Sequence, residues 1–231
     1  MGNENLHIAV AGNIGSGKSS LTSLLAAKFG WRPAYEIVDT NPYLADFYHQ
    51  MDRWSFHLQM FFLSSRFRHQ RELMRHSDAI IQDRTLYEDG EIFARNLYLQ
   101  GKMEERDYRT YLSHFETLME LVRPPSLLIY LKSDVSTLLK RIKHRGRDYE
   151  AAISETYLAQ LNSQYDAWIS RYTKSPVVVV DVSKQDFVNV PKHLEQIASI
   201  VAWELECIKN KAQKPLPLSA KAKREHPQLA L

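Results

Sequence analysis

The segment at residues 12–19 constrains the fold of this chain more than any other feature of its sequence. It reads Gly-Asn-Ile-Gly-Ser-Gly-Lys-Ser, which fits the pattern Gly-x4-Gly-Lys-Ser/Thr, and it directly follows an apolar run at residues 7–11. Glycines in such a loop let backbone N–H groups close on phosphate oxygens, and a helix that begins at the far end favours the same negative charge. The sequence therefore predicts a strand, a phosphate-binding loop and a helix, in that order.

The residues of this loop form the predicted ATP-binding site. Lys18 is expected to reach the β- and γ-phosphates and so to act in catalysis, and the Ser19 hydroxyl is expected to bind Mg²⁺. The alternative is a glycine-rich turn without a ligand, which the flanking strand and helix make less favourable. The predicted loop residues are Gly12, Asn13, Ile14, Gly15, Ser16, Gly17, Lys18 and Ser19.

The composition suits one globular α/β domain. The chain has 231 residues, of which 44% are hydrophobic, and this is long enough to bury a full core. Cys207 is the one cysteine in the sequence, so no disulfide can form within the chain, and a reducing, cytoplasmic setting is the simplest interpretation. The N-terminal segment lacks a signal pattern and no apolar run reaches membrane-spanning length, so we expect no membrane partner.

Charge is distributed unevenly along the chain. Residues 209–231 carry six basic side chains and one acid, so this tail holds +5 of charge and leaves −2 for the rest of a chain whose net charge is +3. A mildly acidic body gives no electrostatic argument for nucleic-acid binding. We expect a folded domain over 1–208 and a basic, disordered tail over 209–231. A nucleic-acid-binding module that uses the tail stays open as an alternative.

Apolar segments at regular intervals predict the fold class. Strands that alternate with helices, and that lack polar alternation, indicate a parallel sheet covered on both faces. A long helix is expected over 52–76, a helical stretch over 85–100 and a last helix over 190–208. The predicted strands are residues 7–11, 34–38, 79–82, 126–131 and 177–180.

Acidic residues stand at the ends of two predicted strands, where open parallel sheets bind their ligands. Glu36 could accept a proton from a substrate hydroxyl, although its position alone favours a solvated loop carboxylate. Asp83 follows the third strand and could bind Mg²⁺, and the adjacent Arg84 could hold a phosphate. The alternative for Asp83 and Arg84 is a surface ion pair. Asp83 is also the rival of Glu36 as the base.

Arginines surround a glycine that breaks a predicted helix. Arg141, Arg145 and Arg147 lie near Gly146, within a predicted lid at about 141–150. They could close over the transferring phosphates and exclude water. A basic helix end favoured by the helix dipole is an equally good interpretation.

A polar amide lies inside the apolar stretch of the long helix. Gln59 and Arg66 are seven residues apart and share one helix face. A buried Gln59 needs hydrogen-bond partners, which a nucleobase edge or a backbone group could supply equally well.

Together these residues resemble the deoxynucleoside kinase family over roughly residues 6–205. Beyond the phosphate-binding loop no single motif is strong, but the joint order and spacing are specific. The motifs are Glu36 followed by Asn41-Pro42-Tyr43-Leu44 and Phe47-Tyr48, then Arg53-Trp54-Ser55-Phe56-His57-Leu58-Gln59, then Asp83-Arg84-Thr85 with Tyr87-Glu88-Asp89, then Arg145-Gly146-Arg147 with Glu150.

The resemblance implies a role for each residue of the predicted site. Glu36 would be the base acting on the substrate 5′-hydroxyl, and Arg84 would contact the reacting oxygen. Asp83 stands where mammalian relatives commonly have glutamate, so the metal geometry is expected to differ slightly. Tyr48 and Glu150 would hold the deoxyribose 3′-hydroxyl. The nucleobase would be held by Gln59, Arg66 and Asp89 at its edge and by Phe93, which stacks on it.

The resemblance also implies a substrate, a topology and a partner. Thymidine-accepting relatives have small or apolar residues in place of Arg66 and Asp89, and the run Tyr87-Glu88-Asp89 looks most like bacterial deoxyadenosine kinases. Deoxyadenosine is therefore the expected main substrate, with deoxyguanosine and deoxycytidine as the alternatives. The family further implies ATP with Mg²⁺, a five-stranded parallel sheet in the order 2-3-1-4-5, and a homodimer built through helices.

Two other classes of protein compete with this interpretation. A nucleoside monophosphate kinase such as thymidylate kinase also has the phosphate-binding loop and an Asp-Arg motif. A GTPase-type switch usually carries Asp-x-x-Gly and Asn-Lys-x-Asp, but no aspartate here lies three residues before a glycine. The only Asn-Lys pair is Asn210-Lys211, and Gln213 replaces the expected aspartate.

Overall fold

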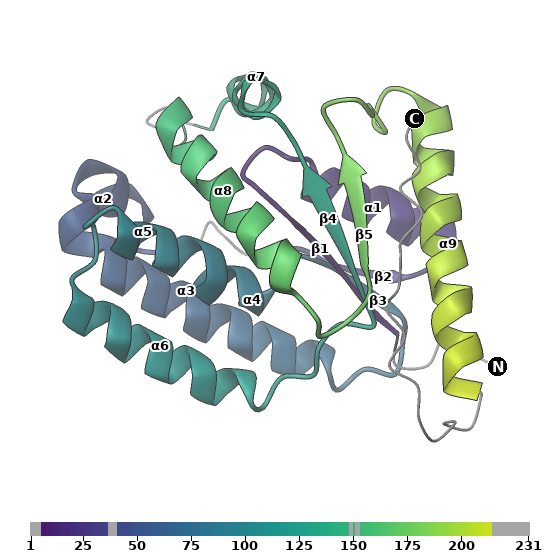
Figure 1. Cartoon of the computed structure of the whole chain (residues 1–231), viewed down its shortest axis with the longest axis horizontal. Coiled ribbons are helices and arrows are strands. Elements are labelled where there is room, and N and C mark those ends of the chain that lie inside the picture. Colours follow the sequence, from purple (N-terminus) through teal and green to yellow (C-terminus); the bar gives the residue numbers. More distant parts are fainter. Residues whose placement is uncertain (1–5, 37–40, 148–149, 151–152, 214–231) are drawn as a thin grey trace.

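A computed structural model of the chain shows a parallel five-stranded sheet in the order β2-β3-β1-β4-β5, as predicted (Figure 1). The structure describes residues 6–36, 41–147, 150 and 153–213. In chain order the strands are β1 (His7–Gly12), β2 (Arg32–Ala34), β3 (Ile80–Asp83), β4 (Leu127–Lys132) and β5 (Val177–Asp181).

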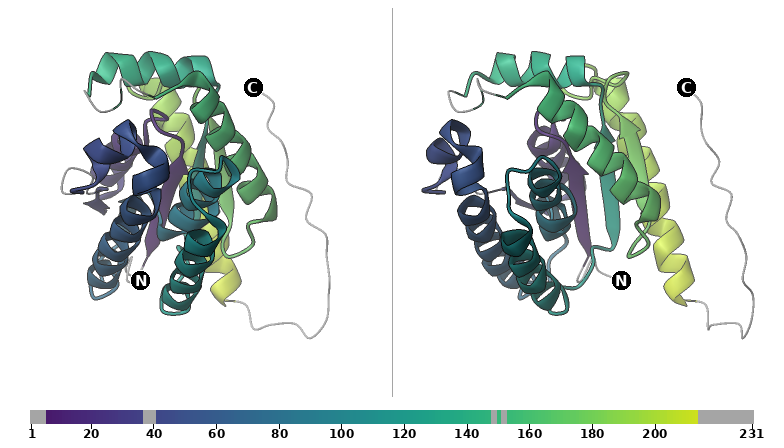
Figure 2. Two further views of the ribbon diagram at one scale, coloured as in Figure 1. Left: turned by 90° about the vertical axis from the view of Figure 1, so that its left-hand side faces the viewer. Right: turned by 60° about the vertical axis from the view of Figure 1, so that its left-hand side comes forward.

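Helices connect the strands and cover both faces of the sheet, and Figure 2 shows the layers from two further sides. Among the described residues, no helix is both long and apolar enough to cross a bilayer. The helical elements are α1 (Lys18–Phe29), α2 (Leu44–His49), α3 (Met51–Leu73), α4 (Leu86–Glu88), the π-helix η1 (Asp89–Ala94), α5 (Arg95–Leu99), α6 (Glu105–Met119), α7 (Val135–Arg145), α8 (Glu155–Arg171) and α9 (Pro191–Gln213).

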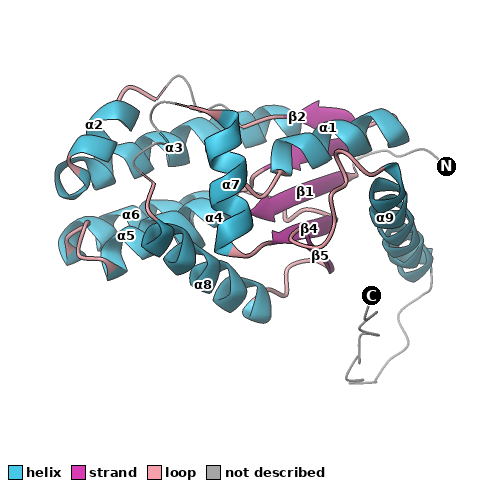
Figure 3. Cartoon of the chain, turned by 90° about the horizontal axis from the view of Figure 1, so that it is seen from above, coloured by secondary structure: helices cyan, strands magenta, loops and turns pink. Residues whose placement is uncertain are grey.

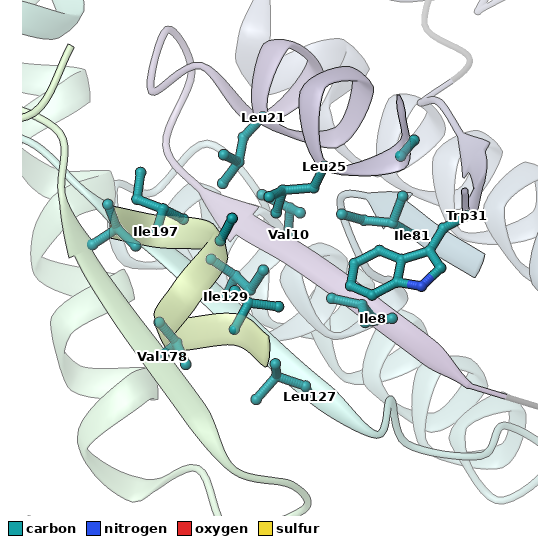
Figure 4. Packing of buried hydrophobic residues seen from close by; sticks show 14 of the residues in the cluster. Ile8, Val10, Leu21, Leu25, Trp31, Ile81, Leu127, Ile129, Val178 and Ile197 are labelled. Atoms are coloured by element: carbon teal, nitrogen blue, oxygen red, sulfur yellow. The ribbon is translucent and has the colours of Figure 1, made fainter. Parts of the chain in front are cut away.

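The apolar strands divide their side chains between two cores. Because successive side chains of a strand point to opposite faces, Ile8 and Val10 pack towards α1 and α9, whereas Ala9 and Ala11 pack towards α8. Figure 4 shows the first of these cores, with Leu21 of α1 against the sheet. Burial on both faces explains why β1 shows no polar alternation in the sequence.

A third apolar cluster joins α2, α3, α5 and α6 beside the sheet. Tyr111 and Phe115 of α6 are buried within it, together with Phe62 of α3. Packing in this cluster places one face of α3 at the carboxyl edge of the sheet. A helix that is far from the phosphate-binding loop in sequence therefore lies near that loop in space.

The predicted strand at 34–38 lies too late in the sequence. The ladder between β2 and β3 starts at Arg32 opposite Ile80 and ends at Ala34 opposite Gln82. β3 itself continues for one more residue to Asp83, so β2 leaves the sheet before its neighbour ends. Glu36 is therefore free of the sheet, and residues 37–40 lie outside the described part of the chain.

The helical stretch predicted over 85–100 is divided into α4, η1 and α5. The π-helical turn is wider than an α-helical one and is often found at functional sites. It includes Asp89 and Phe93, which both line the cavity described below. Gly90 allows this arrangement, because a Cβ atom there would lie 2.7 Å from a ring atom of Phe115.

The last helix, expected over 190–208, continues to Gln213. Part of the segment predicted to be a disordered tail is therefore helical. The prediction of disorder otherwise falls on residues 214–231, which lie outside the described part of the chain.

Candidate active site

The phosphate-binding loop has the conformation that its glycines permit. Gly15 has a φ of 79°, and a Cβ atom there would lie 2.9 Å from the backbone oxygen of Leu138 in α7. Only glycine combines that backbone angle with so close an approach. α1 begins at Lys18, within the last two residues of the loop, and Figure 3 shows α7 lying across the same end of the sheet.

Lys18 is buried beneath the loop. Its Nζ donates to the backbone oxygen of Asn13 at 3.0 Å, while the Asn13 side chain donates to Leu158 and Asn162 of α8. Burial, aided by the nearby Arg84, lowers the pKa of Lys18 to about 8. A bound phosphate would stabilise the ammonium form, so the site holds a cation that favours an anionic ligand.

Asp83 and Ser19 meet at the foot of the loop. The Ser19 hydroxyl donates to Asp83 Oδ2 at 2.5 Å, and Asp83 Oδ1 is buried without a hydrogen-bond partner among the residues that the structure describes. Burial raises the pKa of Asp83 above its usual range. A hydroxyl beside an unsatisfied carboxylate oxygen is a donor set that suits a hard divalent cation.

Carboxylates and guanidinium groups alternate across the neighbouring part of the site. Arg66 of α3 donates to both Glu36 and Asp89, and Arg84 Nε lies 3.0 Å from Glu36 Oε2. All four side chains are largely shielded from solvent. The chain of contacts joins residues from α3, η1 and the ends of β2 and β3.

Arg84 holds a backbone conformation that is unfavourable for a residue with a side chain. Its φ is 67°, which costs about 1–2 kcal/mol for a non-glycine residue. Its N–H donates to the Val10 oxygen at 2.9 Å, and its guanidinium carbon lies 4.4 Å from the centre of the Phe93 ring. Such strain, held in place by surrounding contacts, clusters at active sites.

The two acids of this chain of contacts titrate in opposite directions. Burial favours the neutral form of Glu36, but Arg84, Arg66 and Lys18 outweigh it and hold the pKa of Glu36 at about 2. For Asp89, burial outweighs the attraction of Arg66 and raises the pKa to about 7. Acids with diverging pKa values in one site are a common feature of catalytic centres.

These groups surround a cavity of about 330 Å³. This volume is within the usual range for small-molecule sites. Within the described part of the chain, buried atoms of its wall lack hydrogen-bond partners, among them Gln59 Oε1 and Asp89 Oδ2, and a polar ligand could satisfy them. The predicted residues that line the cavity are Ile14, Gly15, Lys18, Ser19, Glu36, Tyr48, Gln59, Arg66, Asp83, Arg84, Asp89, Phe93, Arg145, Arg147 and Glu150.

The arginines of the predicted lid fall into two groups. Arg145 donates to Glu150 through Nη2 at 2.5 Å and Nε at 3.0 Å, and Arg147 lies 3.7 Å from the same carboxylate. Arg141 is not among the residues that line the cavity. It donates to the backbone oxygens of Ser16 and Val182, so it ties the phosphate-binding loop to the segment after β5.

Several residues of the cavity were not predicted from the sequence. Phe62 lies between Gln59 and Arg66 on one face of α3, so its helical spacing could have indicated it. Tyr35 and Tyr157 also line the cavity, and no pattern in the sequence singles them out. Glu88 does not line the cavity but contacts residues beside it; it belongs to a motif that the sequence shows, and nothing in the sequence gives it a role.

The fold and the site define the class of this protein. A parallel sheet in the order 2-3-1-4-5 delivers a phosphate-binding loop to a cavity that also holds acids, arginines and an amide suited to an organic acceptor. Phosphoryl transfer needs held phosphates, neutralised charge and a positioned acceptor hydroxyl. The protein is a phosphotransferase of the P-loop kinase class.

Comparison with known proteins identifies the family. The family model described as deoxynucleoside kinase matches residues 8–205. The chain is 40% identical to a deoxyadenosine/deoxycytidine kinase of Bacillus subtilis over 86% of its own length and 93% of that protein. It is 33% identical to a deoxyguanosine kinase of the same organism over 84% of its length and 95% of the relative.

Solved structures agree with these sequence relatives. The deoxyadenosine kinase of M. mycoides with bound dATP superimposes with a TM-score of 0.76 and 30% identity, over 85% of this chain and 100% of that one. The same enzyme with bound dCTP gives a TM-score of 0.75 over 85% and 99%. The chain belongs to the deoxynucleoside kinase family and is an enzyme that phosphorylates deoxynucleosides with ATP.

Proposed function

We propose that the main substrate is deoxyadenosine, which ATP phosphorylates at the 5′-hydroxyl to give the 5′-monophosphate. The observation that carries this proposal is the buried ion pair of Arg66 and Asp89, with the Gln59 amide on the same cavity wall. The B. subtilis relative at 40% identity is named for deoxyadenosine and deoxycytidine, and the M. mycoides relative is named for deoxyadenosine, so both names include the proposed substrate. Deoxyguanosine and deoxycytidine are the alternatives.

The chemistry of the nucleobases explains why this pair matters. An ionised Asp89 accepts hydrogen bonds, so it suits the exocyclic amine of adenine or cytosine and opposes the carbonyl oxygen O4 of thymine. A glutamine amide can pair with adenine through one donor and one acceptor. The unsatisfied oxygens of Gln59 and Asp89 are acceptors of this kind. These contacts exclude thymidine more strongly than they separate adenine from cytosine.

At the other end of the cavity we assign roles to the charged groups. Glu36 accepts the proton of the 5′-hydroxyl, and Arg84 stabilises charge at the reacting oxygen. Lys18 and the loop from Gly12 to Ser19 hold the phosphates of ATP. Arg145 and Arg147 give up part of their contact with the Glu150 carboxylate and bind those phosphates. Tyr48 and Glu150 then hold the 3′-hydroxyl, and Phe93 stacks on the base.

Ser19 and Asp83 fit a magnesium ion that accompanies ATP. The fit rests on the buried Oδ1 of Asp83, which no described residue hydrogen-bonds, beside the Ser19 hydroxyl. Bound there, Mg²⁺ would neutralise charge on the β- and γ-phosphates. Burial raises the pKa of Asp83, while the Lys18 ammonium, the Ser19 hydroxyl and the Arg84 guanidinium act in the opposite direction.

We also propose a cytoplasmic homodimer built through helices, and no nucleic-acid or membrane partner. Support for the location comes from the single cysteine. Support for the dimer comes from the resemblance to the family. Size-exclusion chromatography with light scattering tests the dimer, and a mass equal to one chain would contradict it.

Initial rates with deoxyadenosine, deoxyguanosine, deoxycytidine and thymidine test the substrate. We expect the highest kcat/KM for deoxyadenosine and the lowest for thymidine. The corresponding monophosphates serve as the control substrates. Turnover of monophosphates alone would make the protein a monophosphate kinase and overturn the proposal.

Replacing Arg66 and Asp89 together is expected to relax the choice of base. The double variant Arg66→Met, Asp89→Ala removes the buried pair as a unit and leaves no lone charge behind. We expect kcat/KM for deoxyadenosine to fall relative to thymidine by about 10²-fold, since a polar base contact is worth about 1–3 kcal/mol. Unchanged ratios across the four deoxynucleosides would remove the base-reading role.

The raised pKa of Asp89 gives a dependence of deoxyadenosine binding on pH. With a pKa of about 7, Asp89 is mostly protonated at pH 6 and mostly ionised at pH 8. Since the ionised form accepts from the amine, kcat/KM is expected to rise roughly tenfold from pH 6 to pH 8 as the ionised fraction grows. In Asp89→Asn this rise should disappear. If kcat/KM of Asp89→Asn still rises between pH 6 and pH 8, another group causes the pH dependence.

A further inference from the structure

Glu88 has no exposed surface, and its two carboxylate oxygens contact different parts of the active site. Oε2 accepts from the Thr85 N–H at 2.7 Å and from the Thr85 hydroxyl at 3.1 Å. Oε1 accepts from the Gly12 N–H at 3.3 Å and from the Tyr165 hydroxyl at 2.6 Å. Gly12 opens the phosphate-binding loop, and Thr85 ends the motif that contains Asp83 and Arg84.

Only half of this arrangement has a local explanation. Thr85 and Glu88 form a capping box at the start of α4, in which each side chain satisfies a backbone N–H of the other. That device uses Oε2 alone. The contacts of Oε1 reach residues 76 and 77 positions away in the sequence, and helix capping does not require them.

The contacts lie where two strands separate. β1 and β3 pair up to Val10 opposite Asp83, and the Arg84 N–H donates to the Val10 oxygen. Beyond that hydrogen bond the segments that follow β1 and β3 diverge. The first continues into the phosphate-binding loop and the second into α4. The Glu88 carboxylate joins them again, because Gly12 donates to one oxygen and Thr85 to the other.

Tyr165 of α8 completes the arrangement. Its hydroxyl oxygen lies 2.6 Å from Glu88 Oε1 and 2.8 Å from the backbone oxygen of Gly12. The tyrosine is fully buried, so its ring fixes the position of the hydroxyl. Both backbone groups of Gly12 are therefore contacted: its N–H donates to Glu88, and its carbonyl oxygen lies beside the Tyr165 hydroxyl.

We propose that Glu88 is a positioning residue that holds the phosphate-binding loop in register with Asp83 and Arg84, and so aligns the phosphate donor with the acceptor hydroxyl. Glu88 is not among the residues that line the cavity, so it acts through Gly12 and Thr85. The proposal requires the kinase reaction and does not depend on which deoxynucleoside is preferred.

A carboxylate is needed because every partner of these oxygens is a donor. In Glu88→Gln the amide NH₂ would face the N–H of Thr85 or the N–H of Gly12, and one contact would be lost. A misplacement of about 1 Å away from the reacting atoms can cost about 10²-fold in rate. We expect kcat to fall about 10–50-fold, with the KM for the deoxynucleoside and the Kd for ATP within about threefold of the native values.

The experiment uses the full-length chain with its most active deoxynucleoside at saturating ATP. Glu88→Gln is compared with Glu91→Gln, which neutralises a half-exposed acid that pairs with Arg171 on the outside of η1. Tyr165→Phe keeps all charges and removes only the hydroxyl beside Oε1, and it should lower kcat by a smaller factor. The double variant should be no slower than Glu88→Gln, because both changes affect the same oxygen.

The kinetic pattern separates positioning from a purely structural role. Loss of stability alone lowers the amount of folded enzyme but not kcat per active site, so active sites are counted by titration at a temperature well below Tm. A kcat of Glu88→Gln close to that of Glu91→Gln, or a rise in KM at constant kcat, overturns the proposal. If Glu88→Gln does not fold, Tyr165→Phe decides: lowered kcat at constant KM supports it, and native kcat overturns it.

Discussion

Glu36→Gln is expected to lower kcat by about 10²–10⁴-fold, the usual contribution of a general base. The amide keeps the shape of the side chain and can still accept from one guanidinium group. It cannot take the proton of the 5′-hydroxyl. The Kd for ATP, measured by fluorescence titration, should stay within about threefold, because the phosphates are assigned to the loop on the other side of the cavity.

Chemical rescue makes this prediction specific to proton transfer. In Glu36→Ala, added formate should restore part of the lost turnover, whereas chloride at the same ionic strength should not. Near-native turnover of Glu36→Gln would move the role of the base to Asp83, the rival acid in the same cavity.

The ion pairs of Glu36 affect its strength as a proton acceptor. With Arg66 and Arg84 beside it, its pKa is held at about 2, which makes it a weak proton acceptor. Arg66 also contacts Asp89 at the predicted base-reading end of the cavity. A nucleobase that hydrogen-bonds to Arg66 and Asp89 would weaken the contact between Arg66 and Glu36. The pKa of Glu36 would then rise, which would make Glu36 a stronger proton acceptor. The same arginine would then connect recognition of the base with the reacting end.

Asp83→Asn is the change with the second-largest expected effect. It removes the charge beside Ser19 while the amide oxygen can still accept from the Ser19 hydroxyl. Loss of a positioned group that stabilises transition-state charge costs about 2.7–4 kcal/mol, so we expect kcat to fall about 10²–10³-fold. The Mg²⁺ concentration for half-maximal activity should rise about tenfold.

Asp78→Asn is the matched control, since Asp78 is an exposed acid just before β3. It should leave both kcat and the magnesium requirement unchanged. An Asp83→Asn enzyme with a native magnesium requirement would contradict the assignment of Asp83 to the metal, whatever its kcat.

Some features of the active site could be predicted because they depend on residues that are neighbours in the chain. The loop at residues 12–19 is one example, since glycine backbone freedom and the adjoining strand and helix decide its shape locally. The apolar strands are another, because burial on both faces removes polar alternation from each of them. These signals were sufficient for the fold class, and the order of the motifs was sufficient for the family.

Other features depend on packing between distant segments. The end of β2 could not be predicted, because its ladder with β3 stops at Ala34 opposite Gln82 and not where the apolar residues of 34–38 stop. The helical run at 85–100 contains a π-turn that places Asp89 and Phe93 on the cavity wall, and the close approach of Gly90 to Phe115 of α6 permits it. Neither partner is a neighbour in the sequence.

The sequence by itself determined the parallel α/β fold and, through its motif order, the kinase family, and it predicted that a loop at residues 12–19 binds a nucleoside triphosphate. The tertiary structure alone decided which distant groups meet: Arg66 with both Glu36 and Asp89, and Glu88 with both Gly12 and Tyr165. The physical reason is range. Backbone angles and periodicity are set within a few residues, whereas an ion pair between helices exists only once their apolar faces have packed and brought the charges together.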